Sequence, residues 1–290
     1  MNELKNKNLY YVGGVVRDEI LGAKSFDTDF CYEGNAVDFA QNADLNIIKI
    51  NSDFGTVRVK QDGKEIDIAS TREEYYPKPG HLPVVTNIGC SLEKDLKRRD
   101  FTINAMAKNT LTGEIYDPFD GKSDIKKKLL KVLHEKSFID DPTRIVRALK
   151  FSVRFGFELE SETKKLQEKY LENVNYDMSY HRLKKELIET FNLNIGLAFD
   201  MLMENKIYKL LAKNEPKVKI SGEKIQKVVE KAKVTPWIIY MSFFNLENLP
   251  LTRQEKRILE WAERLKTEKI ANNTPQESII INNIYSEFEC

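Results

Sequence analysis

Two glycines followed by two closely spaced aspartates give this sequence a pattern suited to phosphate chemistry. Gly13 and Gly14 end an apolar stretch and begin an amphipathic one, so backbone N–H groups at a helix start can approach a phosphate. Asp27 and Asp29 follow with a single residue between them, and on a strand this spacing directs both carboxylates to the same face. Carboxylates completed by substrate phosphates are the usual ligands of Mg²⁺. The pattern therefore predicts phosphoryl or nucleotidyl transfer at a magnesium site.

A second chemically distinctive segment, residues 95–105, has the sequence DLKRRDFTINA. It places Arg99, Asp100 and Asn104 among apolar neighbours such as Phe101. Charged groups that are buried in such surroundings need partners. The segment is therefore predicted to form either part of a binding site or a structural ion pair, and its composition leaves both open.

The residues around these segments predict a mixed α/β region. Up to about residue 120, short β-rich runs alternate with helical ones. The predicted elements are strands at residues 9–12, 29–32, 56–60 and 66–69 and a short helix at 36–41. Between the last two strands, Asp62-Gly63 is a favoured hairpin turn.

The spacing of apolar residues changes near residue 141, where a helical pattern begins. From there to residue 195, apolar side chains recur three and four positions apart. Asp140 or Asp141, with Pro142 directly after, is typical of a helix start. The chain stays helical to about residue 267, with breaks predicted at Pro236 and Pro250. We predict an α+β protein with an α/β head at residues 1–135, a helical neck at 136–195 and a short helical body at 196–290.

Composition limits the partners and the compartment. The 290 residues carry a formal net charge of +1, which does not indicate a nucleic-acid partner. The lysines within 122–131 and 206–233 are more typical of solvated helix faces than of an RNA-binding surface. No apolar run approaches the roughly 20 residues of a membrane span, and the first residues lack the apolar core of a secretory signal. Because the three cysteines and three histidines are scattered, we expect reduced thiols and a cytoplasmic protein.

Several motifs in the same order resemble the class II tRNA nucleotidyltransferase and bacterial poly(A) polymerase family, which belongs to the DNA polymerase beta superfamily. They are GGVVRDEILG with DTD, RRDFTINAMA, DPFDG and DDPTRIVRALKFSVRF, and the resemblance covers residues 8–190. It implies a polymerase-beta-like head followed by a helical neck and body. The longest members of the family continue through a fuller body and a tail that holds the outer part of tRNA, and no such tail is predicted here.

The resemblance also implies the site residues. Asp27 and Asp29 correspond to catalytic metal ligands, and Asp67 to the third catalytic carboxylate of the superfamily, although Asp67 fits an ordinary strand acid equally well. Asn104 can instead hold its segment in place, and Arg17 can tie the head together. The implied nucleotide-binding residues are Gly13, Gly14, Arg17, Arg99, Asp100, Asn104, Asp141, Arg144 and Arg147.

Asp141 and Arg144 carry the part of the resemblance that concerns the nucleotide base. In the family, the acid and the arginine of this motif hydrogen-bond the base edge and act as a protein template. The two residues lie three apart, hence on one helix face, and such a pair suits the edges of C and A. A surface pair with the acid as helix cap is the alternative. Since His181 stands where the family has glutamate, Arg182 and Glu186 are predicted to brace the neck.

The function implied by the resemblance is template-independent, Mg²⁺-dependent transfer of nucleotides from CTP and ATP to the 3′ end of tRNA, with release of pyrophosphate. Four activities share the motifs: full CCA addition, addition of A alone, addition of CC alone, and poly(A) tailing. A non-catalytic RNA-binding protein with this fold is the remaining alternative. The proline-rich residues 72–83 correspond to a family loop that helps to switch from C to A addition, and a short ordered loop is predicted here.

Overall fold

The computed structural model describes residues 4–25, 28–216 and 220–288. The chain forms two compact units, Met1–Asp140 with Glu158–Thr163 and Asp141–Phe157 with Lys164–Cys290. We call the first the head and the second the helical unit. The head combines a mixed sheet with short helices, and the described elements of the helical unit are all helices, so the predicted α+β class is confirmed. The division into three domains stays a prediction.

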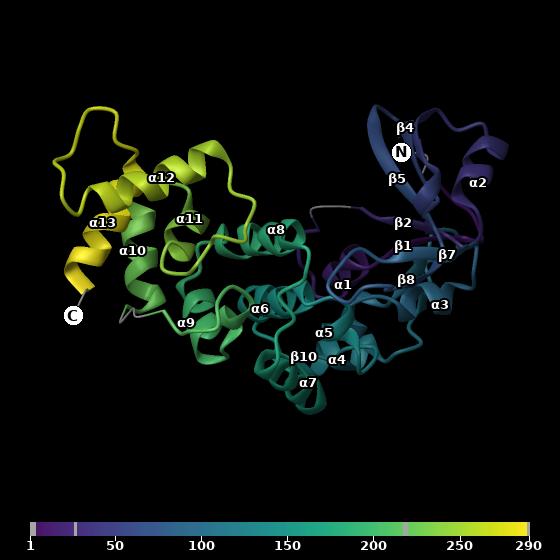
Figure 1. Cartoon of the computed structure of the whole chain (residues 1–290). Coiled ribbons are helices and arrows are strands. Elements are labelled where there is room, and N and C mark those ends of the chain that lie inside the picture. The colour runs from purple at the N-terminus through teal and green to yellow at the C-terminus, as the bar shows by residue number, and fades with distance from the viewer. Residues whose placement is uncertain (1–3, 26–27, 217–219, 289–290) are drawn as a thin grey trace. The chain divides into compact units, whose positions relative to one another are not determined.

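A seven-stranded sheet forms the centre of the head (Figure 1). Its strands, in spatial order, are β3 (Ile47–Asn51), β4 (Thr56–Gln61), β5 (Lys64–Ser70), β2 (Phe30–Tyr32), β1 (Leu9–Val12), β8 (Ala107–Asn109) and β9 (Ile115–Tyr116). The pairing of β2 with β5 is parallel, and the other neighbouring pairs are antiparallel. The predicted hairpin turn between β4 and β5 is confirmed, because Asp62 and Gly63 both have positive φ, at 49° and 79°.

Buried apolar and exposed polar side chains alternate along β4, so the two faces of the sheet differ. Val57 and Val59 are buried in the apolar core with Ile68 of β5, against α2 (Ala36–Asn42). Because successive side chains of a strand point to opposite faces, Arg58 of β4 and Asp67 of β5 lie together on the exposed face. The apolar pattern therefore positions both charged side chains.

A two-stranded antiparallel ribbon follows β5, formed by β6 (Arg72–Tyr75) and β7 (Val84–Ile88). The prediction of a loop over 72–83 is wrong for its first four residues, although the prolines do lie between the two strands. In the remainder, the backbone N–H of Gly80 donates to the carbonyl oxygen of Asp140 at 3.0 Å. The other elements of the head are α1 (Gly14–Ile20), η1 (Ser52–Phe54), α3 (Leu92–Lys97), η2 (Thr102–Asn104), α4 (Gly121–Lys127), β10 (Leu129–Leu130), α5 (Ser137–Asp140) and β11 (Glu158–Leu159).

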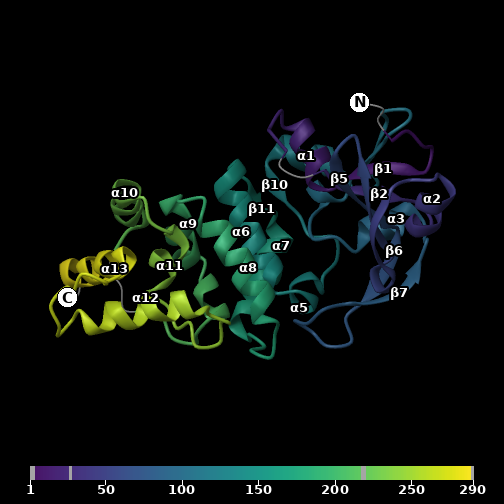
Figure 2. The same ribbon diagram turned by 90° about the horizontal axis from the view of Figure 1, so that it is seen from above.

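The helical unit contains α6 (Thr143–Phe155), most of α7 (Ser161–Glu172), α8 (Tyr180–Phe191), α9 (Gly196–Glu204), η3 (Ile207–Leu210), α10 (Gly222–Ala232), α11 (Pro236–Met241), α12 (Arg253–Arg264) and α13 (Gln276–Phe288). Helix α6 packs against α8, and α12 against α13 (Figure 2). Close packing of α9 on α10 requires glycine, because a Cβ atom on Gly222 would lie 1.8 Å from the carbonyl oxygen of Gly196. Pro236, predicted as a break, begins α11. Within the described residues, no helix is both long and apolar enough to cross a membrane.

Candidate active site

The predicted glycine turn connects β1 to α1. Gly13 has φ 70° and ψ −125°, a conformation that favours glycine. A Cβ atom on Gly13 would lie 3.0 Å from Nη1 of Arg99, whereas the nearest atom to one on Gly14 is Nη2 of Arg17 at 3.4 Å. Gly13 is therefore needed both for the turn and for the close approach of Arg99.

Arg17 and Asn104 belong to a buried hydrogen-bond chain. Arg17 donates from Nε and Nη2 to Oδ1 of Asp18 at 2.9 and 2.7 Å, and from Nη1 to Oδ1 of Asn104 at 2.6 Å. Asn104 in turn donates from Nδ2 to Oδ1 of Asp100 at 2.9 Å, which also accepts from the backbone N–H of Phe101. The chain ties α1 to the 100–104 segment, which is the structural alternative that the sequence left open for Arg17 and Asn104.

Asp95, at the buried face of α3, holds the two arginines that follow it. Its side chain is 0% exposed. Oδ1 accepts from Nε and Nη2 of Arg98 at 3.0 and 2.8 Å, and Oδ2 accepts from Nη2 of Arg99 at 3.0 Å. Burial by itself would raise the pKa of Asp95, but the guanidinium groups of Arg99 and Arg98 outweigh it and hold that pKa below its usual value. Asp95 therefore remains ionised and keeps Arg99 in place.

An open pocket of the head brings together several predicted residues. Asp29, Asp67 and Arg99 line it, together with Arg72 and Arg98, which sequence reasoning did not select. Its other lining residues are Val12, Phe30, Lys49, Asn51, Thr56, Arg58 and Ala69. Acids and arginines in one pocket can bind a phosphate-bearing ligand with a cation.

The pocket contains two of the three carboxylates predicted for the metal site, Asp29 and Asp67. Asp27 lies outside the described residues, and Asp29 is an exposed carboxylate just before β2. Both oxygens of Asp67 accept from Arg58, at 2.7 Å from Nε and 2.8 Å from Nη2, and this pairing lowers the pKa of Asp67. Within the described ranges, no group of three His, Cys, Asp or Glu side chains is placed to hold a metal. The oxygen donors of Asp29 and Asp67 suit a divalent cation, and Asp67 could join only by exchanging Arg58 for the metal.

In the helical unit, the predicted base-recognition residues lie at the start of α6. Asp141 and Arg144 are each 4% exposed. Oδ1 of Asp141 accepts from the backbone N–H and the hydroxyl of Thr143, at 3.1 and 2.6 Å, and Oδ2 accepts from Nη2 of Arg182. These contacts resemble the capping alternative, and Asp141 is buried with its carboxylate engaged on both sides.

Arg147 and Arg182 connect α6 with α8. Nη1 of Arg147 donates to Oε1 of Glu186 at 3.1 Å, and Nζ of Lys150 donates to Oε2 of the same carboxylate at 2.7 Å. Glu186 thus contacts α6, and Arg182 contacts Asp141 just before that helix, in line with the bracing prediction. Arg147 is engaged by Glu186 and also lies over the ring of Phe151 at 5.6 Å.

Sequence reasoning missed four polar residues of the head: Arg72, Glu74, Asp95 and Arg98. Part of their arrangement had a visible signal, because Asp95 stands three and four positions before Arg98 and Arg99, the spacing of neighbours on a helix. The contact of Glu74 with Arg98 joins residues far apart in the sequence, and no sequence pattern indicated it.

A mixed sheet with an interior strand that ends in a glycine turn, beside a pocket of acids and arginines, is typical of the head of a nucleotidyltransferase. Residues 9–131 match the family model described as "Poly A polymerase head domain". The A-adding tRNA nucleotidyltransferase of Aquifex aeolicus is 37% identical over 79% of this chain and 28% of its own length. The CCA-adding enzyme of Leuconostoc mesenteroides is 38% identical over 54% of this chain and 39% of its own length.

Solved structures agree with the sequence comparison. The apo form II of a CCA-adding enzyme matches with a TM-score of 0.77 and 29% identity, over 96% of this chain and 75% of that chain. Similar structures include CCA-adding enzymes in complex with ATP, with CTP and with tRNA. Residues 9–131 thus match the poly(A) polymerase head domain, and the chain is similar in sequence and fold to class II tRNA nucleotidyltransferases. It spans less than half the length of the three curated A-adding relatives, 28, 18 and 46%.

Proposed function

We propose that this chain catalyses template-independent addition of C and A from CTP and ATP to the 3′ end of tRNA, with release of pyrophosphate, in the cytoplasm. One observation carries the proposal: Arg99, held by the ionised Asp95, lines the same pocket as Asp29. Within the described residues its Nη2 atom donates to Asp95 and its Nη1 atom makes no hydrogen bond, so this guanidinium group keeps a donor for a ligand. A triphosphate is an anion that such an arginine binds well.

Addition of A alone is the second candidate. It is favoured by the names of three relatives, A-adding tRNA nucleotidyltransferases that are 37 to 43% identical to this chain. Addition of CC alone and poly(A) tailing are the other two activities that this pocket could catalyse. The experiment below distinguishes all four activities.

In this proposal the head binds the triphosphate and the reacting hydroxyl. Arg99 binds the phosphate. Gly13 leaves room for the Arg99 side chain, and Gly14 begins the helix that follows the turn. Asp100, Asn104 and Arg17 fix that arrangement through their buried hydrogen bonds. Positioning of this kind, with charge stabilisation, provides most of the catalysis in phosphoryl transfer.

The family uses divalent metal ions, and we propose Mg²⁺, held by Asp29 with Asp27 and, after release from Arg58, by Asp67. When bound, the metal would polarise the α-phosphate and lower the pKa of the attacking 3′-hydroxyl. Asp29 contributes an exposed carboxylate to the pocket for this purpose.

In the helical unit, we propose that Asp141, Arg144 and Arg147 contribute to recognition of the base. The burial of Asp141 and Arg144 supports a rigid arrangement, as base discrimination requires. Asp141 would have to share its Oδ2 atom with Arg182 or exchange that partner for the base.

The test uses three tRNA substrates, lacking the whole CCA end, lacking only its A, or complete, each with one nucleotide at a time and with Mg²⁺. Full CCA addition predicts C incorporation into the first, A into the second and nothing into the third. An A-adding enzyme extends only the second, a CC-adding enzyme only the first, and a poly(A) polymerase extends all three with A. Absence of any incorporation would overturn the proposal and leave the non-catalytic RNA-binding alternative.

A further inference from the structure

One arginine of the pocket, Arg72, belongs to none of the motifs from which the site was predicted. It begins β6, and its side chain is 16% exposed. Nε of Arg72 donates to Oε1 of Glu74 at 2.6 Å, and Nη1 donates to the carbonyl oxygen of Phe54 at 3.1 Å. Within the part of the chain that the structure describes, Nη2 of Arg72 makes no hydrogen bond, and neither does Nη1 of Arg99. Two guanidinium groups thus keep unused donors in the pocket that contains Asp29.

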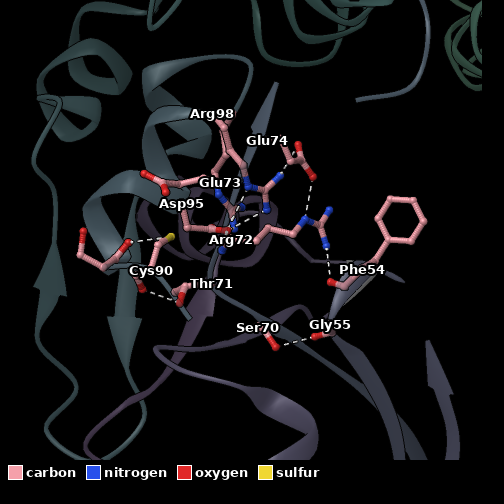
Figure 3. Close-up of polar contacts among 12 residues, drawn as sticks. Phe54, Gly55, Ser70, Thr71, Arg72, Glu73, Glu74, Cys90, Asp95 and Arg98 are labelled. Atoms are coloured by element: carbon pink, nitrogen blue, oxygen red, sulfur yellow. Dashed lines mark hydrogen bonds and ion pairs between the residues drawn. The ribbon is translucent and has the colours of Figure 1, made fainter. Parts of the chain in front are cut away.

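Arg98 lines the same pocket but has a different environment. Its Nε and Nη2 atoms donate to Asp95, and its Nη1 atom donates to Oε2 of Glu74 at 3.2 Å. Each nitrogen of its guanidinium group therefore already has a carboxylate partner. Arg98 connects Asp95 with Glu74 (Figure 3), whereas Arg72 and Arg99 each keep a guanidinium nitrogen that makes no hydrogen bond within the described residues.

The backbone that carries Arg72 is fixed before any ligand binds. The hydroxyl of Ser70 donates to the carbonyl oxygen of Gly55, and that of Thr71 to the carbonyl oxygen of Cys90, both at 2.6 Å (Figure 3). Ser70 and Thr71 are fully buried. The backbone N–H of Arg72 itself donates to Oδ1 of Asp95 at 3.2 Å. A side chain attached to such an anchored backbone loses little freedom on binding, which favours a binding role.

The charges of the cluster favour an anion. Three guanidinium groups, of Arg72, Arg98 and Arg99, face two carboxylates, of Glu74 and Asp95, which leaves one positive charge. Two separate guanidinium groups with free donors suit a ligand with several negative charges close together, and pyrophosphate or the end of a triphosphate has this property. A phosphodiester of RNA carries one charge per phosphate and would use such a pair less well.

We propose that Arg72 binds the terminal phosphates of the nucleoside triphosphate together with Arg99, and that Glu74 is a positioning residue that directs Arg72 toward them. The inference rests on the proposed function, because that function makes a triphosphate the ligand and pyrophosphate the leaving product. Glu74 acts by accepting from Nε of Arg72 while its other oxygen is held by Arg98.

The test measures pyrophosphate binding in the presence of Mg²⁺, by calorimetry on the whole chain and by inhibition of nucleotide addition. Arg72→Gln should weaken pyrophosphate binding about 10- to 100-fold, the range for a lost hydrogen bond between charged groups. It should raise the KM for ATP and CTP by a similar factor and leave the KM for tRNA unchanged. An increase in the tRNA KM alone would assign Arg72 to the RNA backbone and overturn the inference.

Glu74→Gln should weaken pyrophosphate binding less than Arg72→Gln does. In the Arg72→Gln background it should have no further effect, because Glu74 acts through Arg72. Equal effects of Glu74→Gln in both backgrounds would show that Glu74 does not position Arg72. Should Glu74→Gln fail to fold, the Arg72→Gln variant still decides the binding role, since Glu74 then keeps its partner Arg98.

Matched controls come from the neighbouring ion pair between the same strand and helix. Glu73 and Lys94 bridge β6 and α3 at 2.7 Å, are more exposed, and do not line the pocket. Glu73→Gln and Lys94→Gln make the same charge changes and should leave pyrophosphate binding unchanged. Wild-type protein that binds pyrophosphate but adds no nucleotide would contradict the proposed function alone. If the wild type is active and Arg72→Gln binds pyrophosphate as tightly as Lys94→Gln does, the result would contradict this inference alone.

Discussion

Replacing Asp95 with asparagine tests whether one buried carboxylate holds the arginines of the pocket. Oδ1 of Asp95 serves Arg98 and the backbone of Arg72, and Oδ2 serves Arg99. Asparagine has nearly the same shape but a single side-chain oxygen. If that oxygen occupies the place of Oδ1, the amide nitrogen faces Nη2 of Arg99, and two donors oppose each other. Asp95→Asn should therefore release Arg99 more than Arg98.

The stability cost follows from burial. Asp95 is 0% exposed, so the variant leaves its two arginines without their common counter-ion. Breaking a buried ion pair costs about 3–5 kcal/mol, and the lower end applies because Glu74 still neutralises Arg98. For units of this size, each kcal/mol lost lowers the unfolding temperature by about 2–4 °C. The unfolding temperature of the head should therefore fall by about 6–12 °C.

The assay is thermal unfolding of wild type and Asp95→Asn, combined with the KM for ATP and CTP. Glu73→Gln, which removes a charge from the exposed pair with Lys94, is the control. It should change the free energy of unfolding by less than about 1 kcal/mol. Lower pH supplies a second check. Because the folded-state pKa of Asp95 is depressed, its contribution is present above the unfolded value of about 3.9 and is lost as pH falls through the folded value. A stability loss below about 1 kcal/mol at neutral pH, or one that does not shrink in acid, would refute the reasoning.

Three further predictions concern the proposed function. Asp27→Ala or Asp29→Ala should abolish addition of both C and A without lowering the unfolding temperature, because each removes a metal ligand; normal turnover by Asp29→Ala would contradict the metal assignment. Arg144→Ala should reduce discrimination of CTP and ATP against UTP and GTP by about 1–3 kcal/mol, whereas equal slowing of all four nucleotides would make Arg144 structural. Binding of tRNA should weaken with salt, at roughly 0.9 in the log–log slope per phosphate contact. Replacing lysines between Lys206 and Lys233 should lower that slope, and an unchanged slope would remove them from the RNA surface.

The sheet of the head could largely be predicted because its signals are local. β1 spans the predicted residues 9–12, and β4 and β5 contain the predicted ranges 56–60 and 66–69. Alternating apolar residues and a two-residue turn are encoded within a few positions, so a single sequence suffices for them. The first metal-site aspartate, Asp27, lies outside the described residues, and its role stays a prediction.

The β6–β7 ribbon could not be predicted in the same way. Its first strand carries Arg72, Glu73 and Glu74, and the acids among them have low strand propensity. The prolines nearby indicated a loop, and they do lie in the connection. The strand forms because it pairs with β7 and contacts α3, and these contacts involve residues 9 to 24 positions away in the sequence. Such pairing is a property of the folded head and not of the segment.

Arg98 and Arg99 show most clearly what the folded head adds to the motif. In the sequence they are adjacent and identical in chemistry, so no argument from residue type separates them. One buried carboxylate separates them in space, because each of its oxygens faces a different arginine. Arg98 then meets a second acid, Glu74, and its nitrogens are all engaged, while Arg99 meets the glycine turn, where the absence of a Cβ leaves its Nη1 atom room. An arginine whose every nitrogen already serves a carboxylate is better suited to support a site than to bind a phosphate, and the division of labour between the two arginines follows from that difference.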